Sequence, residues 1–128
     1  MQQTLGGSVD TQLVNVKEFG DRGVTMIGRG SDFGNQFKMK KDGGKYTREG
    51  CVTAFEDWWH APEQLALRQR ALDELKGEIL GCHCLGKEGK YDSGGPIKTV
   101  KDEPSVCHGE VILTFINSQS KKSTTHGR

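Results

Sequence analysis

The sequence predicts a small α/β domain, with helices packed on a mixed sheet of about three or four strands. Two observations predict this class. Short runs rich in strand-forming residues and longer runs at helical spacing follow one another in the order β-β-α-α-β-α. The chain has 128 residues, enough for one domain, and its 33% hydrophobic content with 18 glycines predicts a small core joined by long loops.

Two strands are predicted near the start, after a flexible arm at residues 1–10. Residues 13–19 are rich in valine and predict the first strand, and residues 24–27 predict the second. Turn-forming residues at 21–23 separate them. Because this turn is short, we expect the two strands to pair antiparallel.

A glycine-rich segment at residues 28–46 is expected to be a long functional loop. Phe33 and Phe37 within it predict that the loop is ordered. Thr47 is a suitable N-cap for a helix at residues 48–59. Trp58 lies off the apolar stripe of that helix, so it is expected either to pack on the next helix or to form a second contact surface.

A second helix is expected to start at Pro62, because proline is favoured at the first helical position, and to end at Gly77. Three leucines are expected on its inner face, Leu65, Leu72 and Leu75. The third strand is predicted at residues 78–84. Because a helical crossover leads to it, this strand should run parallel to its neighbour.

The remaining chain is expected to contain one helix between two polar segments. Residues 85–106 predict a long polar loop, and residues 107–117 a helix with one apolar stripe. Residues 118–128 contain no large apolar side chain and are expected to form a disordered tail. The single α/β domain is therefore expected to span residues 11–117.

Charge and composition limit the classes of partner. The 18 basic and 17 acidic side chains give a formal net charge of +1, without the strongly basic character typical of duplex-binding domains. Lysines clustered at residues 38–45 leave a local patch for nucleic acid or a host protein. No secretory signal or membrane-spanning run is visible, so we expect a cytoplasmic protein with no membrane partner. In the reducing cytoplasm, the cysteines are expected to be free thiols or metal ligands and not disulfides.

Two Cys/His motifs give the strongest chemical signal. Cys82 and Cys84 close the third predicted strand and share one of its faces, because residues two apart in a strand point the same way. Cys107 and His108 open the last predicted helix. Together these four side chains supply the ligand number of a closed tetrahedral zinc site. Zinc is therefore the expected cofactor if the cluster binds a metal.

The same residues allow two other interpretations. Cys107 at a helix N-terminus would have its thiolate favoured by the helix dipole, and it could act as a catalytic nucleophile with Cys84 as resolving partner. Small cysteines can also simply pack a core. These interpretations stay open at this point, and with them the question of whether the protein is an enzyme.

A third signal points to anion binding. Arg29 lies between two glycines after the second predicted strand and could hold a phosphate or carboxylate through two charge-assisted hydrogen bonds. The helix N-termini at Arg48 and Gly109 supply N–H groups suited to the same ligand. We therefore expect a ligand-binding site formed by Arg29, Ser31, Asn35 and Arg48.

A set of short motifs extends over most of the chain: Ile27-Gly28-Arg29, Gly34-Asn35-Gln36-Phe37, Thr47-Arg48-Glu49, Leu75-Lys76-Gly77, Cys82-His83-Cys84 and Cys107-His108-Gly109-Glu110. With these motifs the chain resembles the domain of unknown function numbered four-three-two-six, over residues 13–117. The resemblance implies a phage or bacterial intracellular origin and supports these site residues, but it implies no reaction. The chain departs from the family pattern at Gln36 (usually proline), at His83 (usually tryptophan) and in the longer segment 85–106.

These observations favour one site built from the loop at residues 28–37 and the two Cys/His motifs. Its expected role is to bind a nucleotide or another phosphorylated small molecule, with processing of that ligand left open. The alternative is a non-catalytic zinc-stabilised module that binds nucleic acid or a host protein. A phosphorylated ligand retained on purification would favour the first, and stoichiometric zinc without a small-molecule pocket would favour the second.

Overall fold

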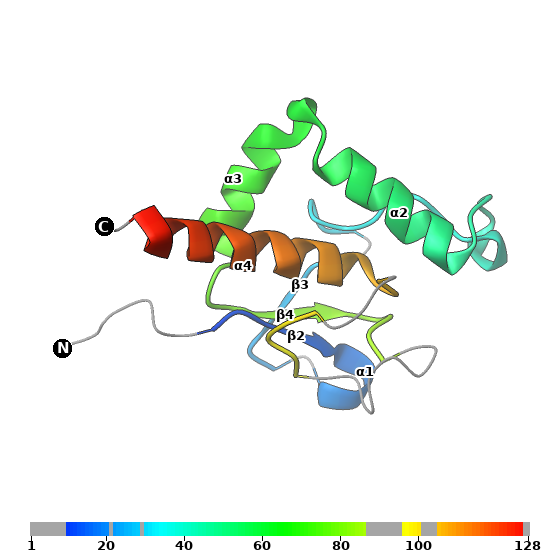
Figure 1. Ribbon diagram of the computed structural model, residues 1–128. Coiled ribbons are helices and arrows are strands. Elements are labelled where there is room, and N and C mark those ends of the chain that lie inside the picture. The colour runs from blue at the N-terminus through cyan, green and yellow to red at the C-terminus, as the bar shows by residue number, and fades with distance from the viewer. Residues whose placement is uncertain (1–9, 21, 29, 87–95, 101–104, 127–128) are drawn as a thin grey trace.

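The computed structural model describes residues 10–20, 22–28, 30–86, 96–100 and 105–126, and it confirms the predicted α/β class (Figure 1). The elements in chain order are β2 (Gln12–Asn15), α1 (Val16–Phe19), β3 (Val24–Met26), η1 (Lys40–Asp42), α2 (Arg48–Trp59), η2 (Pro62–Gln64), α3 (Leu65–Glu74), β4 (Ile79–Cys82) and α4 (His108–His126). The order differs from the prediction by the short helix α1 and the two 3-10 turns η1 and η2. The predicted arm at 1–10 and loop at 85–106 lie largely outside the described residues.

The three strands are parallel, with β4 in the centre of the order β2-β4-β3. Gln12 of β2 and Val24 of β3 both pair with Ile79 of β4. The parallel direction of the third strand is confirmed. The expected antiparallel pairing of the first two strands is wrong, because β4 lies between β2 and β3. The three strands therefore do not form the expected mixed sheet. One isolated antiparallel bridge joins Leu13 of β2 to Ile97, which belongs to none of the three strands.

The first strand ends at Asn15 instead of continuing to Phe19. The Asn15 side chain accepts a hydrogen bond from the N–H of Lys17 at 2.9 Å and thereby caps α1. Its amide donates to the carbonyl of Leu85, also at 2.9 Å. Asparagine favours such local bonds over a strand ladder. Gly20, with a φ of 93°, then ends α1.

Helix α4 lies between the sheet and the pair α2 and α3, while α1 lies on the far side of the sheet (Figure 1). Gly109 permits the close approach of α4 to the sheet, because a Cβ there would lie 2.7 Å from Cδ1 of Leu13. Gly81 permits the close approach of α1 on the other face of the sheet, because a Cβ there would lie 2.6 Å from Cγ1 of Val16. The largest fully buried core side chains include Leu13, Ile27, Phe55, Trp59, Leu75, Leu80, Ile112, Leu113 and Ile116.

Helix α2 has the predicted bounds and the predicted cap. The Thr47 hydroxyl accepts a hydrogen bond from the N–H of Gly50 at 3.0 Å. The buried residues of α2 lie at helical spacing, namely Cys51, Val52, Phe55 and Trp59. Trp58 is half-buried and its ring lies 5.6 Å from that of Phe55, so it packs against its own helix rather than standing free.

Helix α3 differs from the prediction in its inner face. Leu75 is buried as expected, but Leu65 is 54% exposed, and Ala71 is the buried residue of the helix proper. Figure 1 shows the reason: the C-terminal end of α3 meets α4, whereas its N-terminal end lies at the apex shared with α2. Leu65, at the first position of α3, is therefore too far from α4 to be covered.

Helix α4 carries the expected apolar stripe but runs past the expected end at residue 117. Val111, Ile112 and Ile116 are buried, and the helix continues to His126. Residues 118–126, expected in a disordered tail, are thus helical. No glycine or proline lies between Gly109 and Gly127, so nothing in the sequence stops the helix earlier. In the described part of the chain, no helix has the length and apolar character to cross a membrane.

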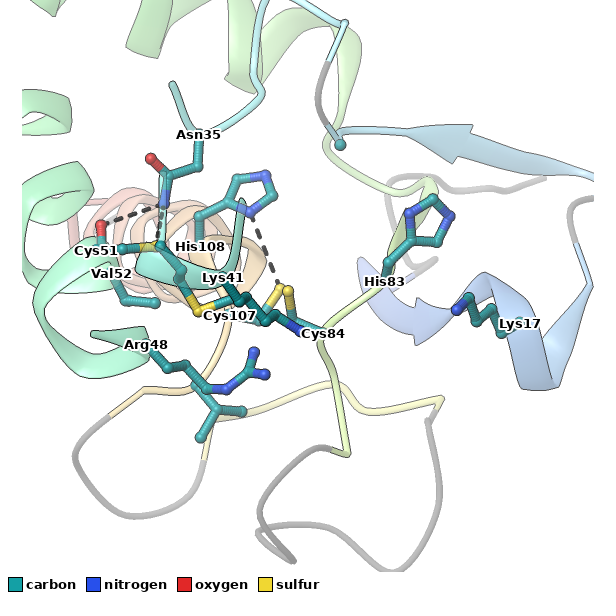
Figure 2. A pocket seen from close by; sticks show the side chains of 13 residues that line it. Lys17, Asn35, Lys41, Arg48, Cys51, Val52, His83, Cys84, Cys107 and His108 are labelled. Carbon is teal, nitrogen blue, oxygen red and sulfur yellow. Dashed lines mark hydrogen bonds between the residues drawn. The ribbon is translucent and has the colours of Figure 1, made fainter. Parts of the chain in front are cut away.

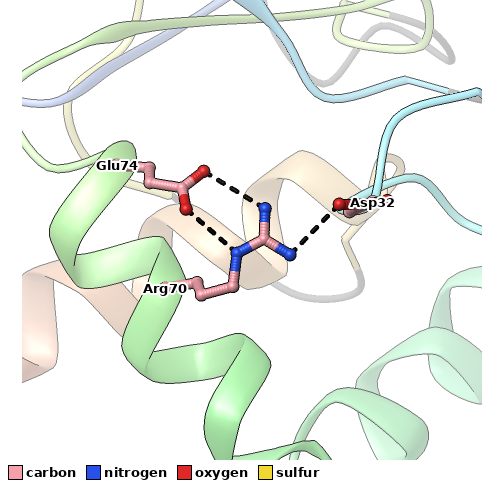
Figure 3. Close-up of polar contacts among 3 residues, drawn as sticks. All are labelled: Asp32, Arg70 and Glu74. Carbon is pink, nitrogen blue, oxygen red and sulfur yellow. Dashed lines mark hydrogen bonds and ion pairs between the residues drawn. The ribbon is translucent and has the colours of Figure 1, made fainter.

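The loop after β3 is fixed to α3 through Arg70 (Figure 3). Its guanidinium donates to Asp32 at 3.1 Å and to Glu74 at 2.9 and 3.3 Å. The same guanidinium lies 5.4 Å from the ring centre of Phe33, which is buried. The expectation of an ordered loop is thereby supported for its first part.

Candidate functional site

A cavity of about 260 Å³ opens at the carboxyl ends of the three parallel strands. Residues that follow each strand reach it: Lys17 after β2, Gly28 after β3, and His83 with Cys84 after β4. The start of α2 and the start of α4 complete the wall with Arg48, Cys51, Val52, Val106, Cys107 and His108, and the loop adds Asn35, Met39 and Lys41. The carboxyl edge of a parallel sheet is where open α/β folds bind their ligands.

The wall of the cavity is positively charged. Lys17 and Lys41 are exposed at its rim, and Arg48 is half-buried. In Figure 2 the guanidinium of Arg48 points toward the sulfur atoms of Cys84 and Cys107. No carboxylate of the described residues lines the cavity. An anion entering it would therefore meet three cationic side chains and, among the described residues, no carboxylate.

Three cysteines form a cluster in the wall. Cys107 is fully buried, and its thiol interacts with those of Cys82, also fully buried, and Cys84, which is half-buried. The Cys107 contact and then Arg48 lower the pKa of Cys84 to about 6. The contacts with Cys82 and Cys84, together with burial, raise the pKa of Cys107 well above its usual value. Although the pKa of Cys82 is also lowered, chiefly by Cys107, we place the negative charge on Cys84, because only Cys84 lies beside a cation and within reach of solvent.

The sequence pointed to Cys107 as the activated thiol, and the position at the helix terminus is correct. The sulfur of Cys107 accepts a hydrogen bond from the N–H of Gly109 at 3.3 Å, as an N-cap does. The neighbouring thiols and burial outweigh this effect and raise the pKa of Cys107, whereas Cys107 and Arg48 lower the pKa of Cys84. The lowered pKa in the cavity therefore belongs to Cys84.

His108 is oriented by a backbone carbonyl. Its Nε2 lies 2.6 Å from the oxygen of Ile27, and because a carbonyl can only accept, Nε2 carries the proton. In the neutral ring the lone pair is then on Nδ1, which lies 4.0 Å from the sulfur of Cys107. The ring is buried and packs edge-on against Phe55 at 5.1 Å.

Glu110 fixes the start of α4 under this cluster. It is fully buried and accepts hydrogen bonds from the N–H groups of Val106 at 2.6 Å and Cys107 at 3.0 Å. A glutamate three residues after the cap that bonds back to it is a capping box. The position of Cys107 in the cavity wall is therefore held by the helix terminus itself.

The four predicted zinc ligands lie near one another where β4 ends and α4 begins. Among the described residues, no group of three or more His, Cys, Asp or Glu side chains is placed to hold a metal ion. His108 has Nε2 on a carbonyl and Nδ1 4.0 Å from the nearest recorded sulfur partner.

The four residues predicted to bind an anion are placed differently in the structure. Arg48 lines the cavity as expected, whereas Arg29 lies outside the described residues. Ser31 does not line the cavity, and its hydroxyl donates to the carbonyl of Gly28 at 2.9 Å. Asn35 lines it, but its amide donates to the carbonyl of Cys51 at 3.2 Å and to that residue's sulfur at 3.3 Å. Asn35 thus fastens the loop to α2.

The helix N-termini contribute less than expected to anion binding. The N–H of Gly109 is bonded to the sulfur of Cys107, and that of Gly50 to the hydroxyl of Thr47. Two of the N–H groups that a ligand would use are therefore already occupied.

Sequence reasoning missed Lys17, Lys41 and His83 as cavity residues. Lys17 was expected inside a strand, and Lys41 was considered only as part of a lysine patch on the surface. The signal that could have found Lys17 and His83 is their place directly after strands, because parallel strands end at one edge of the sheet. That reasoning requires the parallel order of β2 and β4, which the local pattern of the first two strands did not indicate.

Comparison with known proteins gives one match that covers most of the chain. Residues 14–118 match the family model described as Domain of unknown function (DUF4326). No curated protein and no solved structure matches the chain significantly. The match covers most of the sheet, the cavity residues and both Cys/His motifs, as the motif resemblance predicted. The chain therefore belongs to the DUF4326 family.

Proposed function

We propose that the cavity binds a small phosphorylated molecule, such as a mononucleotide. The observation that carries this proposal is the set of three cations, Lys17, Lys41 and Arg48, around a cavity at the carboxyl edge of a parallel sheet. A planar guanidinium can hold a phosphate through two parallel hydrogen bonds. The two lysines at the rim would add point charges for a second phosphate or for steering.

The size of the cavity limits the ligand. Small-molecule sites usually measure roughly 300–1,000 Å³, and this cavity measures about 260 Å³. A mononucleotide or a smaller sugar phosphate therefore fits better than a dinucleotide. Met39, Val52 and Val106 give the wall an apolar part against which a base or sugar could lie.

Binding measurements on the purified full chain test the proposal. Isothermal titration with inorganic phosphate, nucleoside monophosphates and diphosphates, and an unphosphorylated nucleoside should show binding only where phosphate is present. Arg48→Gln should weaken binding at least about tenfold, since a lost charge-assisted pair costs about that much. Lys76→Gln removes an exposed cation outside the cavity and is the matched control. Equal binding of the nucleoside, or equal loss in the control, would refute the proposal.

The alternative proposal is a non-catalytic module, stabilised by zinc, that binds nucleic acid or another protein. Its supporting observation is His108, because a metal-binding histidine usually donates its other ring N–H to a carbonyl or carboxylate, as Nε2 does here. Metal analysis of untreated protein tests it. Stoichiometric zinc, with a melting temperature that falls in chelator, would favour this module. Metal-free protein with unchanged melting would eliminate it.

A further inference from the structure

Cys84 and Cys107 are two thiols in contact that differ in their access to the cavity. Cys84 is half-buried in the wall, whereas Cys107 behind it is fully buried. The two thiols interact, and Figure 2 shows their sulfur atoms side by side. The third thiol, Cys82, is fully buried and does not line the cavity. Cys51 also lines the cavity but is buried, so Cys84 is the most exposed of the cysteines that a small oxidant would meet there.

Two neighbouring residues suit a reaction that starts at Cys84 and ends at Cys107. The Arg48 guanidinium interacts with the sulfur of Cys84 and favours its thiolate, which is the nucleophilic form. The Nδ1 atom of His108, left with its lone pair by the Nε2 bond to Ile27, faces the sulfur of Cys107. One thiol thus has a cation beside it and the other has a base.

We propose that Cys84 and Cys107 form a peroxide-reactive pair, in which Cys84 attacks a peroxide in the cavity and Cys107 resolves the product as an intramolecular disulfide. This inference does not depend on the phosphorylated ligand, although both use the same cavity. Cys51 shows the contrast within the chain. It is buried, and its sulfur accepts a hydrogen bond from the Asn35 amide.

In the first step the Cys84 thiolate attacks one oxygen of hydrogen peroxide. An S–O bond forms and the O–O bond breaks, so the sulfur is oxidised by two electrons to a sulfenic acid and the peroxide is reduced. The second oxygen leaves as hydroxide, takes a proton from solvent and becomes water. Lys41 and Arg48 at the cavity provide positive charge near that developing anion.

In the second step the Cys107 thiol gives its proton to Nδ1 of His108, and its sulfur attacks the sulfur of Cys84. An S–S bond forms and the S–O bond breaks. The leaving hydroxide takes the proton from His108 and becomes a second water. Two thiols and one hydrogen peroxide thus give one disulfide and two waters, and an external dithiol returns the pair to the reduced state.

Mass spectrometry of the full chain treated with stoichiometric hydrogen peroxide, without other ligand, tests the pair. The wild type should lose the mass of two hydrogens, with peptide mapping that places the disulfide between Cys84 and Cys107. Cys84→Ser should abolish the reaction. Cys107→Ser should stop it at a Cys84 sulfenic acid, which dimedone traps. Cys51→Ser and Cys82→Ser should still form the disulfide.

Arg48→Gln keeps every cysteine and checks the proposal even where a cysteine variant fails to fold. It should slow the appearance of the disulfide about tenfold, because less Cys84 is present as thiolate, while Lys76→Gln should not. A disulfide that involves Cys82 or Cys51, a reaction that survives Cys84→Ser, or an oxidation rate equal to that of the urea-unfolded chain would overturn the proposal.

Discussion

His108 and Ile27 join the start of helix α4 to the residue after strand β3 through one short hydrogen bond, 2.6 Å from Nε2 to the carbonyl oxygen. The bond crosses the core at the edge of the cavity, where both groups are shielded from water. It therefore has two effects. It fixes the angle at which α4 leaves the sheet, and it determines which ring nitrogen faces the cysteines.

The first prediction follows from this bond. His108→Phe keeps the edge-on packing against Phe55 but leaves the buried carbonyl of Ile27 without this donor, so the free energy of unfolding should fall by about 1–3 kcal/mol. Urea denaturation measures the change. His60→Gln, at an exposed histidine after α2, is the control and should change the stability little. A loss no greater than that of the control would show that the bond is not important for stability.

The second prediction concerns Glu110. Glu110→Ala leaves the N–H groups of Val106 and Cys107 without their acceptor inside the core, and should cost about 2–4 kcal/mol. Glu110→Gln keeps an oxygen in the same place and should cost less. Thermal or urea unfolding compares the two, and Glu49→Ala in the exposed first turn of α2 is the control. If both substitutions of Glu110 cost the same, the two hydrogen bonds do not determine its contribution.

The third prediction uses the two glycines Gly109 and Gly28. Alanine normally stabilises a helix by up to about 1 kcal/mol over glycine, but at Gly109 a Cβ would lie 2.7 Å from Cδ1 of Leu13 and 3.2 Å from Cδ1 of Ile27. Gly109→Ala should therefore destabilise the protein by about 1–3 kcal/mol. Gly28→Ala meets no atom within 4 Å and should be near neutral. A stabilised Gly109→Ala variant would show that α4 can move away from the sheet at no cost.

The fourth prediction is a pH profile for Cys84. Because the pKa of its thiol is lowered to about 6, alkylation of Cys84 by iodoacetamide should rise between about pH 5 and 7 and then level off. Cys107→Ala and Arg48→Gln remove the two main causes, so each should move the rise to higher pH. The urea-unfolded chain provides the reference, with a rise near about pH 8.5. The same profile for folded and unfolded protein would contradict the assigned environment.

Local signals in the sequence were sufficient for several elements. Helix α2 has its predicted bounds because Thr47 caps it and its apolar residues repeat at helical spacing. The start of α4 and its buried stripe were predicted on the same grounds. These features depend on neighbours within one or two turns, so the sequence pattern contains them.

The sheet order could not be predicted in this way. Residues 13–19 and 24–27 separated by a turn look like a hairpin, and only the distant strand β4, inserted between them, makes them parallel. Asn15 adds to the difference by bonding the carbonyl of Leu85, a partner seventy positions away in the chain. Only part of the cavity could be predicted, because the sheet order determines which strand ends meet there. Cys84, Cys107 and Arg48 were recognised by residue type, whereas Lys17 required knowledge of the sheet edge.

The central position of β4 has a consequence for how the protein is made. Strands β2 and β3 leave the ribosome first, but neither can pair until β4 has been synthesised, and α4, which covers the sheet, follows later still. Such a topology places the long-range contacts at the end of folding and favours slow, all-or-none formation. The cavity is built from the ends of the same strands and the first turn of α4. A nascent chain therefore exposes its cysteines until the whole domain closes, and the surroundings that lower the pKa of Cys84 exist only in the folded domain.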